Sequence, residues 1–113
     1  MVVRRLDGTL VCEKCEVADS ILSRMRGLLG RSELLPGEGL LIRPAPSIHT
    51  FFMRFPIDAV FLDGDLRVLA VRPEVGPWRT AGHRGARAVL ELPAGESSRR
   101  GIRAGDQLVV GPS

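Results

Sequence analysis

The residues best suited to chemistry lie in one mostly apolar stretch, HTFFMRFPIDAVFLD, which covers residues 49–63. It contains His49, Arg54 and Asp58 among apolar neighbours. Histidine and a carboxylate can pass a proton between them if they reach the same substrate, and arginine can bind an anion through two parallel hydrogen bonds. This stretch therefore contains the first candidates for a functional site.

Asp58 follows Pro56 in a run that reads as buried. A buried carboxylate without partners costs several kcal/mol or takes up a proton. We expect Asp58 to have a partner, and the candidates are Arg54, His49 or backbone amides freed at the Pro56 bend. In the structural interpretation, Asp58 caps the bend and ties two strands together. In the functional interpretation, Asp58 and His49 line a pocket with perturbed ionisation.

Glu91 is a second carboxylate between apolar residues, in the run AVLELP. If its strand neighbours the 49–63 stretch, Glu91 can join the same polar cluster. If the strand is an edge strand, Glu91 faces water. One hypothesis is therefore an enzyme of hydrolase or lyase type that uses His49 with Asp58 or Glu91 as acid and base.

Trp78 is the only tryptophan of the chain, and it lies between Pro77 and Arg79 in a long predicted loop. An exposed tryptophan beside arginine can anchor a ligand or a protein partner. The alternative is that Trp78 folds back as a lid over the core. The binding hypothesis predicts a small module that presents a pocket to an anionic or sugar-like ligand or to a protein segment, and its candidate residues are His49, Arg54, Asp58, Trp78, Arg79 and Glu91.

Cys12 and Cys15 form a single CEKC motif. A structural zinc site needs four ligands, and the two histidines, His49 and His83, do not have the usual spacing for completing one. The alternative is a thioredoxin-like redox pair, which needs the motif at the start of a helix, but residues 16–19 intervene before the predicted helix. We interpret the cysteines as two unrelated small residues, and we predict neither a metal nor another cofactor.

Composition and charge exclude several classes of protein. The chain has 113 residues and a net charge of +3, which suits one domain, residues 1–113, with a core of its own. The excess charge lies in residues 79–113, which hold six arginines and three acidic residues. Nucleic-acid binding through the arginines of residues 79–103 is an alternative function, but the charge is modest for it. The first residues do not resemble a secretory signal and no segment is apolar enough to span a membrane, so we expect a cytoplasmic protein.

The hydrophobic pattern predicts a mainly β chain. Residues 2–12 read as a hairpin with a type I′ turn at Asp7-Gly8, and FLDGDLRVL, residues 61–69, reads as a second hairpin. Residues 19–29 read as a helix with one apolar stripe. Short apolar runs separated by Pro and Gly then predict strands at residues 40–43, 49–53, 59–63, 66–72, 88–92 and 107–110. We expect a compact, mostly antiparallel β-sandwich or barrel, with the helix covering one face.

Five blocks in order resemble the prokaryotic family called domain of unknown function 192. The blocks are RMRGLLGR, GEGLLI, HTFFMRFPIDAVFLD, VLELPAG and GIRAGDQLVV, and the resemblance covers about residues 6–110. It implies a compact β-sandwich of jelly-roll type. No catalytic residue can be transferred from the family.

Overall fold

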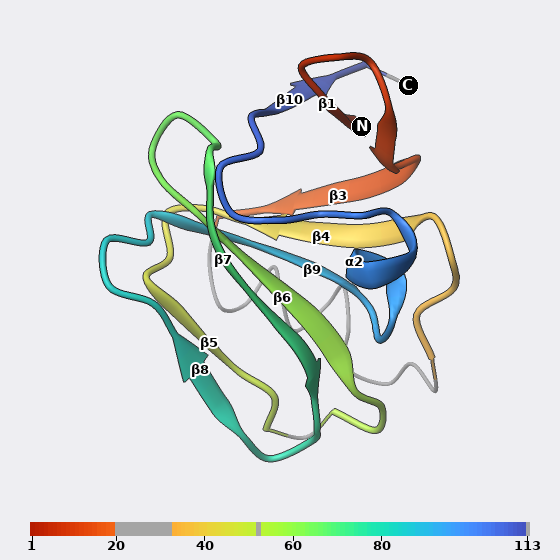
Figure 1. Cartoon of the computed structure of the whole chain (residues 1–113). Coiled ribbons are helices and arrows are strands. Elements are labelled where there is room, and N and C mark those ends of the chain that lie inside the picture. The colour runs from red at the N-terminus through yellow and green to blue at the C-terminus, as the bar shows by residue number, and fades with distance from the viewer. Residues whose placement is uncertain (20–32, 52, 113) are drawn as a thin grey trace.

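The computed structural model describes residues 1–19, 33–51 and 53–112, and these form ten strands and one short helix (Figure 1). The elements are β1 (Val2–Arg5), β2 (Leu10–Cys12), β3 (Lys14–Ala18), β4 (Glu38–Ile42), β5 (Ser47–His49), β6 (Ile57–Leu62), β7 (Val68–Val75), β8 (Thr80–Gly82), β9 (Ala88–Pro93), α2 (Glu96–Arg99) and β10 (Leu108–Gly111). The prediction of a mainly β chain is confirmed. The helix predicted at residues 19–29 lies outside the described residues, apart from Asp19, which is in a bend.

Both predicted hairpins are present. In the first, β1 pairs with β2 in antiparallel register, and the amide of Gly8 donates to the Arg5 carbonyl at 2.9 Å. Gly8 alone in this turn has a positive φ, of 94°. The loop therefore has the three-residue form with one left-handed residue, and it is not the two-residue type I′ turn that Asp7-Gly8 predicted. In the second hairpin, β6 pairs with β7 around Asp63-Gly64-Asp65.

A five-stranded sheet in the order β3-β4-β9-β6-β7 forms the middle of the molecule. Every residue of β6 and β9 is buried, as expected for strands that are covered on both faces. All described pairs in this sheet are antiparallel except β3 with β4, which are parallel. The parallel pair was not expected, because nothing in the sequence pattern identified β3 and β4 as neighbours.

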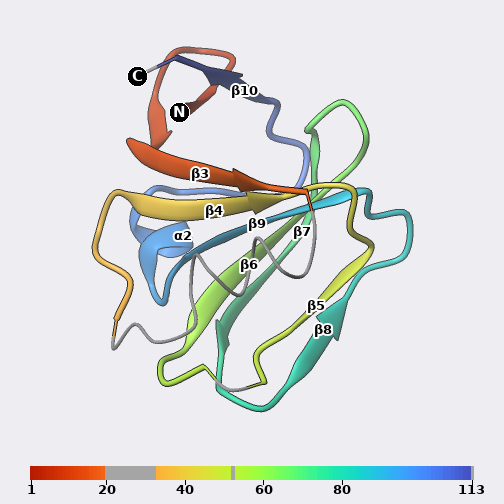
Figure 2. The ribbon, with the colours of Figure 1, turned by 180° about the vertical axis from the view of Figure 1, so that it is seen from behind.

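Two further sheets pack against this middle sheet. A three-stranded sheet in the order β10-β1-β2 lies beyond β3, and the β5–β8 pair lies at the opposite end of the molecule (Figures 1 and 2). One face of the middle sheet shares a core with Ile48 of β5 and Ala81 of β8. The other face shares a core with Val3, Val11 and Leu108 of the three-stranded sheet. The described sheets are layered and do not close into a barrel.

The predicted strand 49–53 is wrong beyond its first residue. β5 ends at His49, and residues 50–51 form the start of a turn. The alternation of apolar residues on both sides of this segment indicated a central strand covered on both faces, but Phe51 is 37% exposed and β5 pairs only with β8 among the described strands. The backbone turns here because Thr50 bonds across to the next loop, a contact between distant segments that strand alternation cannot reveal.

Among the described residues, no helix is long and apolar enough to cross a membrane.

Candidate functional site

Thr50 joins the end of β5 to the loop that precedes β8. Its side chain is fully buried, and its hydroxyl donates to the Gly76 carbonyl at 2.6 Å and accepts from the Arg79 amide at 2.8 Å. Its backbone amide donates to the Arg79 carbonyl at 2.8 Å, and its carbonyl accepts from the Trp78 amide at 3.0 Å. One threonine therefore fixes the backbone on both sides of Trp78.

Above Thr50, three rings form what we call the aromatic row, made of His49, Phe51 and Trp78. The ring centroids of His49 and Phe51 are 4.9 Å apart, and those of Phe51 and Trp78 are 5.8 Å apart. Both pairs are stacked, with interplanar angles of 27° and 28°, and both distances fall in the range of favourable aromatic pairs. The structure thus brings together two segments that are far apart in the sequence.

Trp78 is 57% exposed, although its side chain is large and mostly apolar. Its φ of 61° places it in the left-handed region, which is strained for a bulky residue and occurs most often where a function depends on it. Of the two alternatives that the sequence left open for Trp78, the structure has the exposed side chain and not the one folded back over the core.

Two arginines accompany the aromatic row. Arg79 follows Trp78 directly and Arg54 lies in the bend after Met53, and both side chains are exposed. Exposed guanidinium groups can pair with carboxylates through two hydrogen bonds. In the chain, Arg79 is therefore next to Trp78 and Arg54 follows Phe51 by three residues, and both can reach solvent.

Asp58 lies away from this surface, fully buried on β6. Its Oδ1 accepts from the amides of Glu74 at 2.9 Å and Gly95 at 3.1 Å, and its Oδ2 accepts from the amide of Ser97 at 2.9 Å and the Ser97 hydroxyl at 2.5 Å. Asp58 therefore ties β6 to β7 and to the start of α2. This is the structural role that the sequence suggested, but the amides come from distant segments and not from the Pro56 bend.

Glu91 is also fully buried, on β9. It faces Ala59 across the β6–β9 pair, whereas Asp58 faces Leu92. Because neighbouring residues of a strand point to opposite faces, the two carboxylates lie on opposite faces of the middle sheet. The structure thus brings His49 and Trp78 into one aromatic row, with Arg79 adjacent to Trp78 in the chain, and it separates Asp58 from Glu91. Both oxygens of Asp58 are already bonded to backbone amides and to Ser97.

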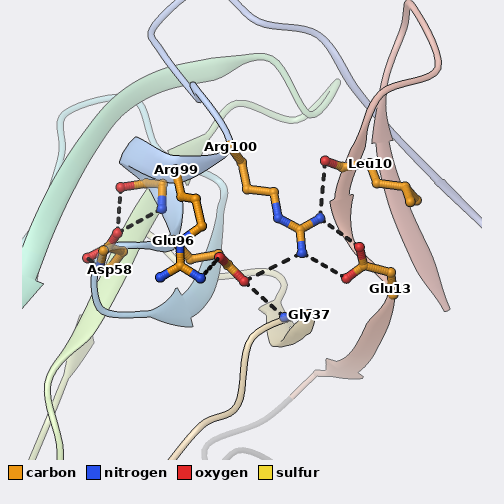
Figure 3. A network of polar contacts seen from close by, with 9 residues as sticks. Leu10, Glu13, Gly37, Asp58, Glu96, Arg99 and Arg100 are labelled. Atoms are coloured by element: carbon orange, nitrogen blue, oxygen red, sulfur yellow. Dashed lines mark hydrogen bonds and ion pairs between the residues drawn. The ribbon is translucent and has the colours of Figure 1, made fainter.

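A polar network that sequence reasoning missed connects α2 to the N-terminal hairpin (Figure 3). Arg100 donates to both oxygens of Glu13 at 2.7 and 3.0 Å and lies 3.5 Å from Oε2 of Glu96. Because of this bidentate contact, the pKa of the Glu13 carboxyl is lowered and that of Arg100 is raised. The spacing of Glu96 and Arg100, four residues apart and followed by Gly101, was a usable signal for a short helix.

Two arginines of the last third take part in this network. Arg99 lies 3.2 Å from Oε1 of Glu96 while its side chain stays 63% exposed, and Arg100 is only 19% exposed at its side chain. The network therefore covers Arg100 and leaves Arg99 accessible. Within the described ranges, no group of three or more His, Cys, Asp or Glu side chains is placed to hold a metal ion.

The family resemblance is confirmed by comparison with known proteins. The model of the DUF192 family, described as "Uncharacterized ACR", matches residues 2–110. The UPF0127 protein of Pyrococcus abyssi is 32% identical and the match covers 84% of each chain. The UPF0127 protein of Thermococcus sibiricus is 29% identical over 96% of this chain and 73% of its own length.

A solved structure is similar as well. The crystal structure of a protein of unknown function from Novosphingobium aromaticivorans superposes with a TM-score of 0.81 at 27% identity. The match covers 96% of this chain and 82% of the other. The layered β fold described above is therefore shared with an experimentally determined structure.

Proposed function

We propose that this chain, which belongs to the DUF192 family, is a small binding module whose aromatic row contacts a protein segment. The segment carries apolar side chains that pack on Phe51 and Trp78, and acidic side chains that pair with Arg54 and Arg79. This proposal narrows the binding hypothesis to one class of partner.

The observation that carries the proposal is the stacked row with Trp78 57% exposed at its end. Binding energy in protein interfaces is concentrated in a few residues, and tryptophan and arginine are strongly enriched among them. The buried Thr50 hydroxyl holds the backbone of this surface in place. A partner then meets rings that are already ordered, which lowers the entropy lost on binding.

The shape of the surface favours a protein segment over a small molecule. Small-molecule sites are concave and bury most of the ligand. The row itself is an exposed stack of rings, which suits side chains of a partner that pack on it from above.

The experiment that tests this function is selection of short peptides from a random display library on the folded chain. We expect the selected peptides to share an acidic residue beside an aromatic or aliphatic residue. We also expect them to lose binding to the double variant Phe51→Ala/Trp78→Ala. A matched control is Leu6→Ser, because Leu6 is 74% exposed in the N-terminal hairpin, away from the row. Peptides that bind the double variant as well as the unmodified chain would show that the row is not the binding surface.

A further inference from the structure

Cys12 and Cys15 come together in the core beneath the three-stranded sheet. Cys12 ends β2 and Cys15 is the second residue of β3, and the two are 0% and 3% exposed in the same core cluster. Both are free thiols. The interpretation of these cysteines as two unrelated small residues therefore does not describe their arrangement.

The sulfur of Cys12 lies over the backbone next to Cys15. Cys15 pairs in register with Gly39 of β4, and a Cβ atom placed on Gly39 would lie only 2.8 Å from Sγ of Cys12. Sγ of Cys15 lies 3.4 Å from the Glu16 carbonyl oxygen. The nearby Cys12 thiol is the main reason that the pKa of the Cys15 thiol is lowered, and the nearby Cys15 thiol is the main reason that the pKa of Cys12 is raised. Cys15 is thus the thiol that loses its proton first, and Cys12 is placed to attack it afterwards.

The turn between the cysteines borders a hollow. The Gly37 carbonyl accepts from the amides of Glu13 and Lys14, at 3.0 and 2.8 Å, and Sγ of Cys12 lies 3.3 Å from the same oxygen. Gly37, Glu13 and Lys14 also line the hollow of about 280 Å³. On its other side, the Gly37 amide donates to Oε2 of Glu96, which anchors this wall to α2 (Figure 3). A small molecule in the hollow is therefore separated from the dithiol by one backbone turn.

We propose that Cys12 and Cys15 form a redox-active dithiol that exchanges with small disulfides entering at the hollow beside Gly37. The Cys15 thiolate attacks one sulfur of the disulfide, forms a mixed disulfide and releases the first small thiolate, which takes up the proton that Cys15 lost. Cys12 then gives up its proton and attacks the Cys15 sulfur. This step closes the Cys12–Cys15 bond, and the second small thiolate leaves and takes the Cys12 proton. The protein dithiol loses two electrons, and one small disulfide becomes two thiols.

Cys12 and Cys15 suit this exchange because their thiols lie close together and their pKa values are shifted in opposite directions. The thiolate is the attacking species in thiol–disulfide exchange, and only one of the two cysteines has a lowered pKa. Because both sulfurs are buried, attack requires the CEKC turn to open locally at the hollow. Exchange is therefore slower than for a surface thiol, and it favours oxidants small enough to enter.

The test uses the folded chain with an excess of oxidised glutathione, followed by intact mass measurement and thiol counting. We expect the unmodified chain to lose two hydrogen atoms in mass and both free thiols, without a lasting glutathione adduct. The variant Cys12→Ser, which lacks the second attacking thiol, should instead keep one glutathione on Cys15. The matched variant Cys15→Ser should react more slowly than Cys12→Ser, because it lacks the thiol of lower pKa.

If either serine variant fails to fold, an experiment on the unmodified chain alone still tests the proposal. Partial oxidation followed by alkylation should give molecules with both thiols or with none, because closure of the disulfide removes them together. Molecules that carry two glutathione adducts, or that keep both thiols while a small model dithiol in the same solution is oxidised, would overturn the proposal.

Discussion

Asp58 and Glu91 lie one register step apart on neighbouring strands, yet their side chains are on opposite faces of the middle sheet. Asp58 points to the side of α2 and accepts four hydrogen bonds. Glu91 points to the side that β5 and β8 cover. Two buried carboxylates that seemed to belong to one site therefore have separate surroundings, and the candidate surface for binding lies elsewhere, at the aromatic row.

Replacing Asp58 by alanine is expected to lower the free energy of unfolding by about 3 kcal/mol or more, because each buried polar group left unpaired costs about 1 to 3 kcal/mol. The change removes the acceptor of the amides of Glu74, Gly95 and Ser97. Urea denaturation measures the effect. The matched control is Asp65→Ala, an exposed aspartate in the β6–β7 turn. Equal stability of the two variants would show that Asp58 does not anchor the start of α2.

The ion pair between Glu13 and Arg100 should make stability depend on pH. The pKa of Glu13 is lowered in the folded state, so its contribution is present above the unfolded carboxyl pKa of about 4.3 and is lost as the pH falls through the folded value. At pH 7, Glu13→Gln should lower the free energy of unfolding by about 1 kcal/mol or less, since the Glu13 side chain is 39% exposed.

The measurement is urea denaturation of both chains from pH 7 down to pH 3. We expect the difference between unmodified chain and Glu13→Gln to shrink steadily over the acidic part of this range. A control is Glu16→Gln, at an exposed position of β3. A difference that persists unchanged in acid would mean that Glu13 acts through packing and not through its charge.

Gly39 is expected to tolerate no side chain. A Cβ there would lie 2.8 Å from Sγ of Cys12 and 3.0 Å from the backbone oxygen of Glu91, and the β9 backbone cannot move away without disturbing the sheet. Gly39→Ala should lower the free energy of unfolding by about 1 to 3 kcal/mol, as overpacking of a core does. Gly64→Ala, where the new Cβ meets nothing within 4 Å, is the control. Thermal unfolding of both variants side by side tests this, and equal midpoints would contradict the tight approach of β4 to β9.

The left-handed backbone at position 78 should be less strained with glycine than with any residue that has a Cβ. Its φ of 61° suits glycine and strains any residue with a Cβ. Trp78→Gly should therefore be more stable than Trp78→Ala by about 1 kcal/mol, whereas both variants lose the stacking surface equally. Denaturation midpoints of the two variants measure the difference. If the alanine variant is the more stable, the left-handed backbone is not held in the folded chain.

Local signals were sufficient for much of the fold. The two Asp-Gly turns and the apolar runs of β6 and β9 identified the hairpins and the existence of these strands, because turn residues and apolar runs act over a few neighbouring positions. The parallel β3–β4 pair and the strand order were not accessible, since they depend on which distant segments pair. The helix α2 was missed because its four residues lie among Gly and Ser, which read as a loop.

The candidate site was predictable only in its parts. The loop position of Trp78 beside Arg79 followed from the sequence, but its exposure was one of two alternatives that the sequence left open. The stacking of Phe51 on Trp78 did not, because Thr50 ends the β5 strand through bonds to residues 76–79. The expectation that Asp58 and Glu91 meet failed for a similar reason. The face of each side chain is set by the pairing register, and one residue of register decides between the two faces.

The most direct test of the proposed function is the fluorescence of Trp78, because it is the only tryptophan of the chain. A peptide with acidic and apolar residues, selected on the folded chain, is titrated while the tryptophan emission is recorded. We predict a saturable change in emission, about tenfold weaker binding by Phe51→Ala and by Arg79→Ala, and no loss in Leu6→Ser. A peptide that binds the chain while leaving the emission of Trp78 unchanged, with the same affinity for all these variants, would contradict the account.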